Sequence, residues 1–231
     1  MKKRPDLVVM LTNNDLTVPD ALEVFESCRD LPVQDWGFKN VGPEEKYLKE
    51  LGRAMKDAGK NVYFEVISYN EEAYMRAAKL AEECKVDFLT GTKYSPTLHE
   101  VLKKAGINYS PFVGKVGCVW KGRSGMLMGD YDELVAEAKD LLYVKKTYGL
   151  DVSAYRHIES PEKVIDSLTQ ALPEAHICIA GSVDTYEKID KLFDAGVAKF
   201  TMGSALFKGH WVPGGSFREN LEHVLNYMES R

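Results

Sequence analysis

The sequence predicts a (β/α)8 barrel, and two observations lead to that fold class. Short apolar segments alternate with amphipathic segments along the chain, which indicates βαβ units and a parallel sheet. Eight such units occupy 231 residues, and a closed barrel of this kind typically takes ~250 residues. An open, doubly wound sheet is the alternative. The whole chain, residues 1–231, is expected to form a single barrel domain.

The eight predicted strands are short segments rich in apolar, β-branched or aromatic residues. The third of them, with the sequence NVYFEVIS, shows this composition most clearly. In chain order the strands are Leu7–Leu11, Trp36–Val41, Asn61–Ser68, Asp87–Thr92, Ile107–Val113, Asp151–Ile158, His176–Ser182 and Lys199–Ser204.

Helices are predicted between these strands from their end signals. The helix over residues 43–59 begins with Pro43 and two acidic residues and ends at Gly59. Its apolar residues recur at helical spacing, namely Tyr47, Leu48, Leu51 and Met55. Further helices are predicted over 70–84 with Asn70 as the cap, over 95–106 and 160–172 after Ser-Pro pairs, and over 184–196 with Asp184 as the cap.

One segment, residues 114–130, interrupts the alternation after the fifth strand. Two short apolar runs flank the turn-like sequence KGRS, which predicts an inserted β-hairpin. In a barrel, the loop after a strand lies on the face that carries the chemistry. A lid over the site, a decorative insertion and an oligomer contact are the alternatives for this hairpin.

Composition and charge exclude several classes of protein. Hydrophobic residues are 45% and charged residues 28%, as in globular proteins, and a net charge of -5 argues against a general nucleic-acid binder. No stretch approaches the ~20 apolar residues of a membrane span. The four cysteines are dispersed without a CxxC pair, and no HExxH occurs. We therefore expect reduced thiols in a cytoplasmic protein without a zinc site.

Two Gly-Ser pairs follow the last two predicted strands. Gly181-Ser182 ends the seventh strand and Gly203-Ser204 ends the eighth, so the pairs should lie side by side at the carboxyl rim. Glycine permits close approach to the backbone, serine adds a hydroxyl, and a following helix offers unpaired N–H groups. The two pairs predict a phosphate site. The alternative is that the glycines only form tight turns.

Residues 176–209, which contain both pairs, resemble the closing segment of ribulose-phosphate-binding barrels. That group includes phosphoribosyl isomerases, ribulose-phosphate epimerase-like enzymes and ketoacid-phosphate aldolases. The resemblance implies that Gly181, Ser182, Gly203 and Ser204 hold a phosphate. The rest of the chain departs from each family. The histidine-pathway isomerases carry an Asp near the end of strand one and another on strand five, whereas LTNND places Asp15 beyond strand one and SPFVGK has no acid. The metal-binding His and Asp residues of the epimerases are absent, and SAYRHI has no lysine where the aldolases use one. The reaction is therefore not implied.

A charged pair is predicted on the second and third strands. Glu65 shares its side of the strand with Tyr63 and Ile67, and an inward-facing Glu65 needs a cation. Lys39 on the neighbouring strand is the natural partner. Such a pair suits catalysis, with Glu65 as general base and Lys39 polarising a carbonyl. The alternative is a structural ion pair.

Two lysines at later strand ends are candidates for covalent chemistry. Lys93 follows the fourth strand and Lys115 the fifth, and a desolvated lysine can form a Schiff base with a carbonyl substrate. The alternative for both is a solvated loop charge.

Three polar residues at other strand ends complete the candidates. Arg156 and His157 end the sixth strand, so one of the two should point inward. Arg156 suits a carboxylate or second phosphate, and His157 suits proton transfer or a packed, hydrogen-bonded role. Asn13 follows strand one and either binds substrate hydroxyls or, with its neighbours, caps the next helix. The loop over 208–216 is expected to approach the phosphate side.

Together these features predict an enzyme that acts on a small phosphorylated sugar or ketoacid. The expected step is proton abstraction next to a carbonyl, as in an isomerase, without a cofactor or metal. A Schiff-base aldolase, a non-catalytic phosphometabolite-binding barrel and an FMN-binding barrel are the alternatives. The expected partner is a small anionic metabolite, with no nucleic acid and no membrane, and a homo-oligomer is compatible with this prediction.

Overall fold

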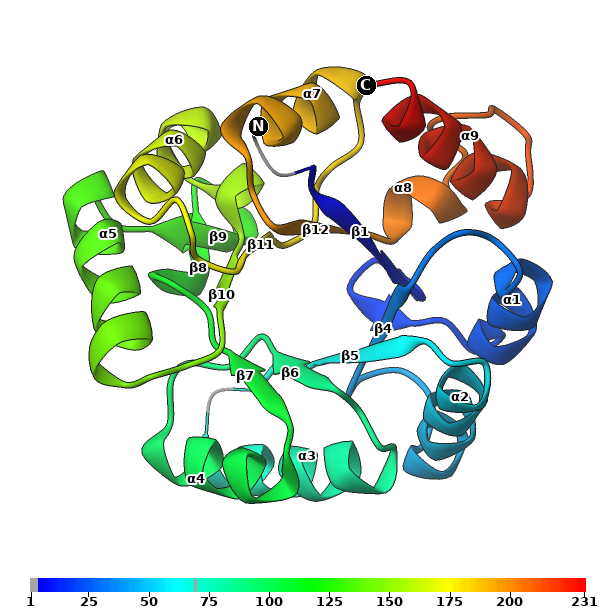
Figure 1. Cartoon of the computed structure of the whole chain (residues 1–231), viewed down its shortest axis with the longest axis horizontal. Coiled ribbons are helices and arrows are strands. Elements are labelled where there is room, and N and C mark those ends of the chain that lie inside the picture. Colours follow the sequence, from blue (N-terminus) through cyan, green and yellow to red (C-terminus); the bar gives the residue numbers. More distant parts are fainter. Residues whose placement is uncertain (1–3, 69) are drawn as a thin grey trace.

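The computed structural model describes residues 4–68 and 70–231 and shows the predicted barrel (Figure 1). Its parallel sheet has the strand order β10-β11-β12-β1-β4-β5-β6-β7. Just after β7, Phe112 forms a parallel bridge with Asp151 of β10, which closes the barrel. In sheet order the strands are β10 (Leu150–Val152), β11 (Ile177–Ile179), β12 (Lys199–Met202), β1 (Asp6–Met10), β4 (Asp35–Lys39), β5 (Asn61–Glu65), β6 (Phe88–Thr90) and β7 (Asn108–Ser110).

The eight predicted strands are confirmed, although most are shorter than predicted, the sixth most of all. It ends at Val152, and the chain then turns into a short 3-10 helix, η2 (Ala154–Arg156). The backbone N–H of Arg156 donates to the carbonyl of Ser153 at 2.9 Å, which closes this turn. Arg156 and His157 are therefore not alternating residues of a strand, and strand periodicity does not decide which of them points inward.

Helices surround the barrel (Figure 1), and several of them begin with a polar side-chain cap. Asn70 accepts a hydrogen bond from the N–H of Ala73, as predicted. The prediction for Asp184 is wrong, because the Thr185 hydroxyl caps the seventh helix. The helices are α1 (Ala21–Cys28), α2 (Glu45–Asp57), α3 (Glu71–Glu83), α4 (Pro96–Ala105), α5 (Tyr131–Lys139) continuing into the π-helix η1 (Asp140–Val144), α6 (Pro161–Ala171), α7 (Tyr186–Ala195), α8 (Ser204–Phe207) and α9 (Phe217–Glu229).

Two apolar regions lie on the two sides of the sheet. The larger one fills the space between strands and helices, and a smaller one inside the barrel contains Val8, Met10 and Tyr63 with Phe88 packed against them. The rings of Tyr63 and Phe88 stack at 4.3 Å. Because strand residues alternate, Glu65 lies on the same inner side as Tyr63. Side chains therefore fill the lower barrel and leave its carboxyl end polar.

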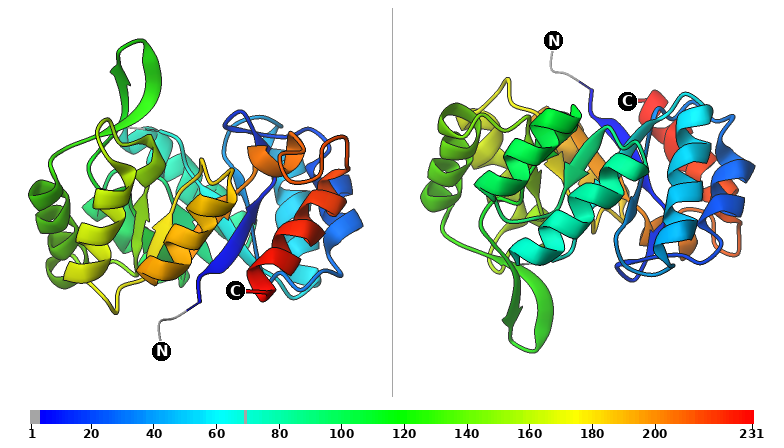
Figure 2. Two further views of the ribbon diagram at one scale, coloured as in Figure 1. Left: turned by 90° about the horizontal axis from the view of Figure 1, so that it is seen from above. Right: turned by 90° about the horizontal axis from the view of Figure 1, so that it is seen from below.

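The insertion after β7 is the predicted hairpin, and it projects from the barrel (Figure 2). Its strands are β8 (Lys115–Trp120) and β9 (Arg123–Met128). The two residues between them, 121–122, have positive φ angles of 47° and 76°, as a two-residue hairpin turn requires. Glu137 of α5 accepts a hydrogen bond from the N–H of Gly114 at 3.0 Å, which ties the start of the hairpin to the barrel.

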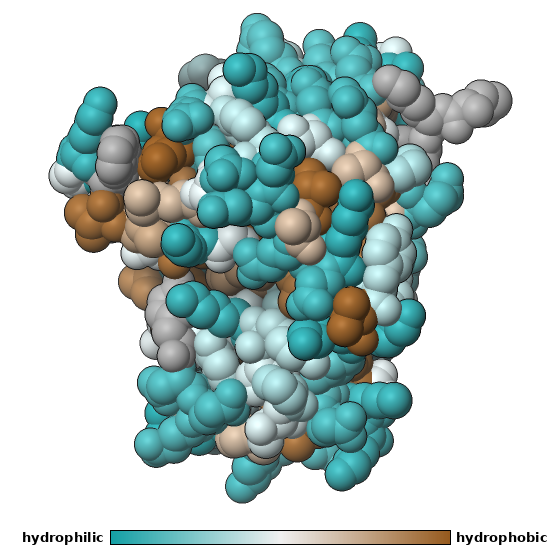
Figure 3. Space-filling model, turned by 90° about the vertical axis from the view of Figure 1, so that its left-hand side faces the viewer, coloured by the Kyte–Doolittle hydropathy of each residue, from teal (hydrophilic) through white to brown (hydrophobic). Residues whose placement is uncertain are grey.

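The outer surface is mainly hydrophilic on the face shown in Figure 3, where polar side chains separate the apolar ones. The larger exposed apolar residues include Val119 in the hairpin and Val144 in η1. Within residues 4–68 and 70–231, no helix has the length and apolar character needed to cross a bilayer.

Candidate functional site

A cavity of about 510 Å³ opens at the carboxyl ends of the barrel strands. Gly181, Ser182, Gly203 and Ser204 all line it, so the two predicted Gly-Ser pairs lie together as expected. The cavity wall also includes residues of β4, β5 and the base of the hairpin. One hollow therefore contains both the predicted anion cradle and the predicted charged pair.

The backbone of the first Gly-Ser pair is unusual. Gly181 and Ser182 both have left-handed φ angles, 68° and 59°. The N–H of Gly181 donates to the hydroxyl of Thr201 on β12 at 2.8 Å, which fixes this loop to the neighbouring strand. A left-handed conformation costs a non-glycine residue such as Ser182 roughly 1–2 kcal/mol, and strain of this kind often occurs at ligand sites.

The second pair lies tightly against the end of β1. A Cβ atom at Gly203 would come within 2.7 Å of the carbonyl oxygen of Thr12 and 2.9 Å of that of Met10. Only glycine therefore allows β12 to approach β1 so closely. Ser204 and Ala205 follow at the start of α8, where backbone N–H groups have no partner within a helix.

Basic side chains lie around the two Gly-Ser pairs. Arg156 lines the cavity, and a Cβ atom at Gly181 would lie 4.0 Å from its Nη2 atom. The exposed side chains of Lys208 and His210 also line it, from the loop expected to approach the phosphate side. Among the described residues Lys208 forms no ion pair with a carboxylate, so its charge is available to a ligand.

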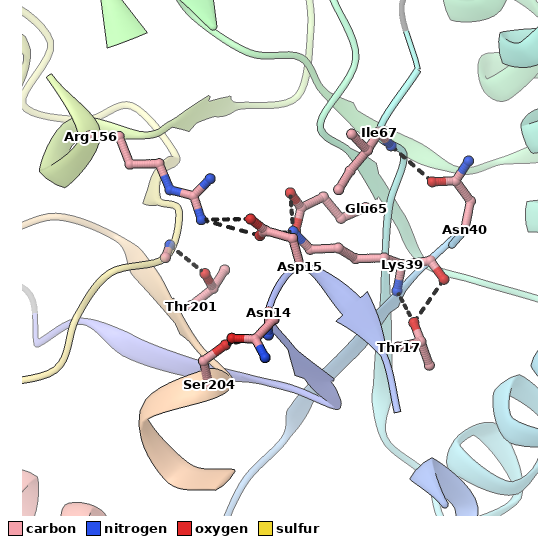
Figure 4. Close-up of polar contacts among 11 residues, drawn as sticks. Asn14, Asp15, Thr17, Lys39, Asn40, Glu65, Ile67, Arg156, Thr201 and Ser204 are labelled. Atoms are coloured by element: carbon pink, nitrogen blue, oxygen red, sulfur yellow. Dashed lines mark hydrogen bonds and ion pairs between the residues drawn. The ribbon is translucent and has the colours of Figure 1, made fainter. Parts of the chain in front are cut away.

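Lys39 lies at the centre of a charged cluster (Figure 4). The β4–β5 register places it opposite Glu65, and its Nζ atom lies 3.1 Å from Glu65 Oε1 and 2.9 Å from Asp15 Oδ1. The ion pair expected from the sequence is present. Burial lowers the pKa of Lys39, but the charges of Glu65 and Asp15 outweigh this effect and leave the pKa above its usual value. Lys39 is therefore an ammonium ion at neutral pH.

Asp15 reaches this cluster through a small hairpin that the sequence interpretation missed. The strands β2 (Thr12–Asn13) and β3 (Leu16–Thr17) pair antiparallel, and Asn14 and Asp15 form the turn with φ angles of 49° and 64°. Asparagine and aspartate favour such a turn. The expected helix cap is wrong, because α1 begins after Asp20 and no side chain of this segment caps it.

Asn13, the predicted substrate ligand, does not line the cavity. Its Oδ1 atom is buried and has no hydrogen-bond partner. The neighbouring Asn14 does line the cavity, and its backbone N–H donates to Ser204 Oγ at 3.0 Å. The turn over 14–15 therefore contacts the anion cradle as well as the charged cluster.

Arg156 holds the other side of Asp15. Its Nη2 atom lies 3.1 Å and 3.2 Å from the two carboxylate oxygens. Partial burial raises the pKa of Asp15, but Lys39 and Arg156 together lower it below the usual value. Asp15 is thus a carboxylate bridging two cations (Figure 4).

Asp151 of β10 is a second acid that the sequence interpretation missed. It is 3% exposed, and its Oδ1 atom has no hydrogen-bond partner. Burial, together with the nearby charge of Glu65, raises the pKa of Asp151 well above its usual value, although Lys39 opposes this. An acid within the apolar sequence LDV was the available signal, because such a carboxyl must face the barrel interior when its neighbours pack against helices.

Besides Asn13, three other predicted residues lie outside the cavity. Lys93 and Lys115 are exposed, do not line it, and act electrostatically on Glu137 of α5. His157 is buried outside it, with Nδ1 accepting from the N–H of Glu159 at 3.3 Å and Nε2 lying 2.9 Å from the carbonyl of Gly129. These contacts make His157 a packed residue that holds the end of the hairpin.

Similar folds occur among solved structures at low sequence identity. Orotidine 5'-phosphate decarboxylase from Pyrococcus horikoshii OT3 superposes with a TM-score of 0.70 at 13% identity, covering 96% of this chain and 99% of that one. The chain is a TIM barrel. The native KDPGal structure matches it with a TM-score of 0.69 at 14% identity, covering 100% and 97% of the two chains.

A third similar barrel is N-acetylmannosamine-6-phosphate 2-epimerase from Clostridium perfringens, with a TM-score of 0.61 at 10% identity and coverage of 96% and 92%. The resemblance to phosphate-binding barrels inferred from residues 176–209 is thus confirmed at the level of the fold. No protein-family model and no curated protein sequence matches the chain.

Proposed function

We propose that this barrel is an isomerase that acts on a small phosphorylated sugar or ketoacid by removing a proton next to a carbonyl. The observation that carries the proposal is the position of the anion cradle and the Lys39–Glu65 pair in one cavity. A substrate held by its phosphate at one wall can present its carbonyl to the pair at the other. The similar barrels include a decarboxylase and an epimerase named for phosphorylated compounds, which supports this substrate class.

The phosphate is assigned to the wall formed by the two Gly-Ser pairs. Gly181 and Gly203 let a dianion approach the backbone, and Ser182 and Ser204 supply hydroxyl groups. Arg156 lies beside this wall. Exposed backbone amides, hydroxyls and cations are the groups that bind phosphate in proteins.

The proton transfer is assigned to Glu65. Its carboxylate lies beside the Lys39 ammonium, whose raised pKa keeps it charged. In this mechanism Glu65 takes the proton from the carbon next to the carbonyl, and Lys39 stabilises the negative charge that develops on the carbonyl oxygen. The hydroxyl group on that carbon gives its proton to the former carbonyl oxygen, and Glu65 returns its own proton to the former carbonyl carbon, so the atoms balance without another reactant.

The same geometry disfavours a Schiff-base aldolase. An amine must be neutral to attack a carbonyl, and the acids around Lys39 raise its pKa. Lys93 and Lys115 are outside the cavity. Borohydride trapping with phosphorylated ketoacids is therefore expected to leave the protein without a lysine adduct, and a stable adduct would support the aldolase instead.

The direct test is solvent exchange. The protein is incubated in deuterated water with a panel of phosphorylated ketoses and ketoacids, and proton NMR follows deuterium entry next to the carbonyl. Wild type is expected to exchange at least one compound, and Glu65→Gln to abolish that exchange while inorganic phosphate still binds. Glu50→Gln, at an exposed position of α2, is the matched control. Undiminished exchange in Glu65→Gln contradicts the proposed base, and phosphate binding without any exchange by wild type favours a binding protein.

A further inference from the structure

The most informative feature of the cavity is a carboxylate that belongs to the protein itself. Asp15 lies between Lys39 Nζ, 2.9 Å from Oδ1, and Arg156 Nη2, 3.1 Å from Oδ2 (Figure 4). These cations come from different parts of the barrel, β4 and the 3-10 turn after β10. Charge-assisted contacts of this kind are the strong ones in carboxylate recognition. Lys39 and Arg156 therefore form a carboxylate-binding site in the cavity, and Asp15 occupies it.

The side chains of the two cations are less exposed than that of the acid they bind. The side chains of Lys39 and Arg156 are 8% and 32% exposed, whereas that of Asp15 is 48% exposed. Asp15 is presented by the turn of a hairpin with only two residues in each strand. Displacing this turn breaks few backbone contacts, while displacing Lys39 disturbs the barrel sheet.

We propose that the substrate carries a carboxylate as well as a phosphate, and that this carboxylate replaces Asp15 between Lys39 and Arg156. The inference rests on the proposed function, since the phosphate cradle fixes the other end of the same molecule. It narrows the substrate class to phosphorylated ketoacids. In an α-ketoacid the carbonyl is bonded to the carboxylate, so Lys39 contacts both groups and Glu65 lies next to the adjacent carbon.

The charges of the cavity agree with this exchange. With Asp15 in place, Lys39 faces two carboxylates and Arg156 faces one. When Asp15 withdraws, Lys39 keeps only Glu65, and Arg156 has no acidic partner among the described residues. A substrate carboxylate restores the balance at the same position, which a neutral sugar hydroxyl does not do.

The turn also connects the two ends of the cavity. The N–H of Asn14 donates to Ser204 Oγ at 3.0 Å, next to the acid that binds Arg156. Withdrawal of the turn therefore frees the Ser204 hydroxyl for the phosphate at the same time as it frees both cations for the carboxylate. A substrate with both anionic groups gains from both changes.

Two commercial probes test the carboxylate site without knowledge of the substrate. 3-Phosphoglycerate and glycerol 3-phosphate share the phosphate and differ in a carboxylate against a hydroxymethyl group. Calorimetric titration is expected to show wild type binding 3-phosphoglycerate about tenfold more tightly, the size of one charge-assisted contact. Arg156→Gln is expected to bring this ratio close to one, with folding checked by circular dichroism.

Asp15→Asn removes the internal competitor and keeps the size of the side chain. It is expected to raise the preference for 3-phosphoglycerate about tenfold further, because the carboxylate no longer displaces a charged group. Asp20→Asn is the matched control, since it removes the same charge from an exposed residue that lies outside the cavity. It is expected to leave the ratio unchanged.

The outcomes separate the two proposals. If both probes bind with equal affinity to wild type and to Asp15→Asn, the carboxylate site is refuted while the phosphate cradle stands. If neither probe nor inorganic phosphate binds, the cradle itself is wrong and the proposed function fails with it.

Discussion

The barrel contains two lysines that each lie between two carboxylates, at opposite ends of the strands. Lys39 near the carboxyl ends contacts Asp15 and Glu65. Lys199 at the amino end of β12 contacts Asp35 and, at 3.3 Å, Asp6. In both cases burial lowers the pKa of the lysine and the acids more than compensate. The chemistry of the two clusters is therefore nearly the same.

Their surroundings differ. Asp35 is 3% exposed, belongs to β4 and accepts a second hydrogen bond from Asn61 of β5 at 2.8 Å, so strand residues build the lower cluster. The upper cluster opens into the cavity of about 510 Å³, and one of its acids lies on a turn, whereas the lower cluster lines a smaller hollow of about 280 Å³ at the amino ends of the strands. In TIM barrels the carboxyl face carries activity and the amino face carries stability. A buried ion pair alone does not mark an active site, and the groups around it decide its role.

The largest expected difference between the clusters is in turnover. Glu65→Gln is expected to lower kcat by about 10³-fold, since it removes the proposed general base. Asp35→Asn is expected to leave kcat within about twofold of wild type, because no reacting group contacts it. Steady-state kinetics on the compound found by solvent exchange provides the measurement, and equal losses in the two variants would remove the distinction.

The loss of thermal stability should be larger in Asp35→Asn than in Glu65→Gln, the reverse of the order expected for kcat. Asp35→Asn leaves Lys199 with only the exposed Asp6 and is expected to lower the free energy of unfolding by about 3 kcal/mol. For a chain of this size that corresponds to a fall in Tm of roughly 6–12 °C. Glu65→Gln is expected to lower Tm less, since Lys39 keeps Asp15. Thermal denaturation of both variants shows whether the lower cluster is the structural one.

The pH dependence of stability sharpens the comparison further. Asp151, near the upper cluster, has a raised folded-state pKa, so above the ordinary value of 3.8 the native state holds a proton that the unfolded state has lost. The contribution of Asp151 to the free energy of unfolding is therefore complete below pH 3.8, and it is lost as the pH rises from 3.8 through the folded-state pKa. Asp151→Asn cannot ionise and should gain stability relative to wild type from pH 4 to 8. Urea titrations across this range measure the gap, and a constant gap contradicts a protonated Asp151.

The smallest effect is expected from lysines that belong to neither cluster. Replacing both Lys93 and Lys115 by alanine should change kcat by less than about twofold, because neither side chain lines the cavity. A loss comparable to that of Glu65→Gln would mean that the hairpin or its neighbouring loop moves over the cavity during turnover.

Much of this architecture follows from the sequence, because it depends on local patterns. Strand alternation and helix caps predict the eight units, and side-chain parity with strand adjacency predicts the Lys39–Glu65 pair. The position of the two Gly-Ser pairs in one cavity is also predictable, because neighbouring parallel strands end side by side.

The missed or misplaced residues depend on contacts between segments distant in the chain. Asp15 reaches Lys39 only because a two-residue turn folds back, and it meets Arg156 across 141 positions of sequence. Arg156 points into the cavity because β10 ends in a 3-10 turn, which strand periodicity does not reveal. Lys115 is the first residue of the hairpin and is exposed, and the start of this hairpin is tied to α5 by the hydrogen bond from Gly114 to Glu137.

The hairpin is attached to the barrel at both of its ends. Glu137 binds the N–H of Gly114, and His157 binds the carbonyl of Gly129. Val116, Gly117 and Gly125 contribute to the cavity wall, whereas the turn beyond them projects into solvent. Insertions and deletions at this tip can therefore accumulate without disturbing the barrel, because the residues that line the cavity lie nearer the base of the hairpin.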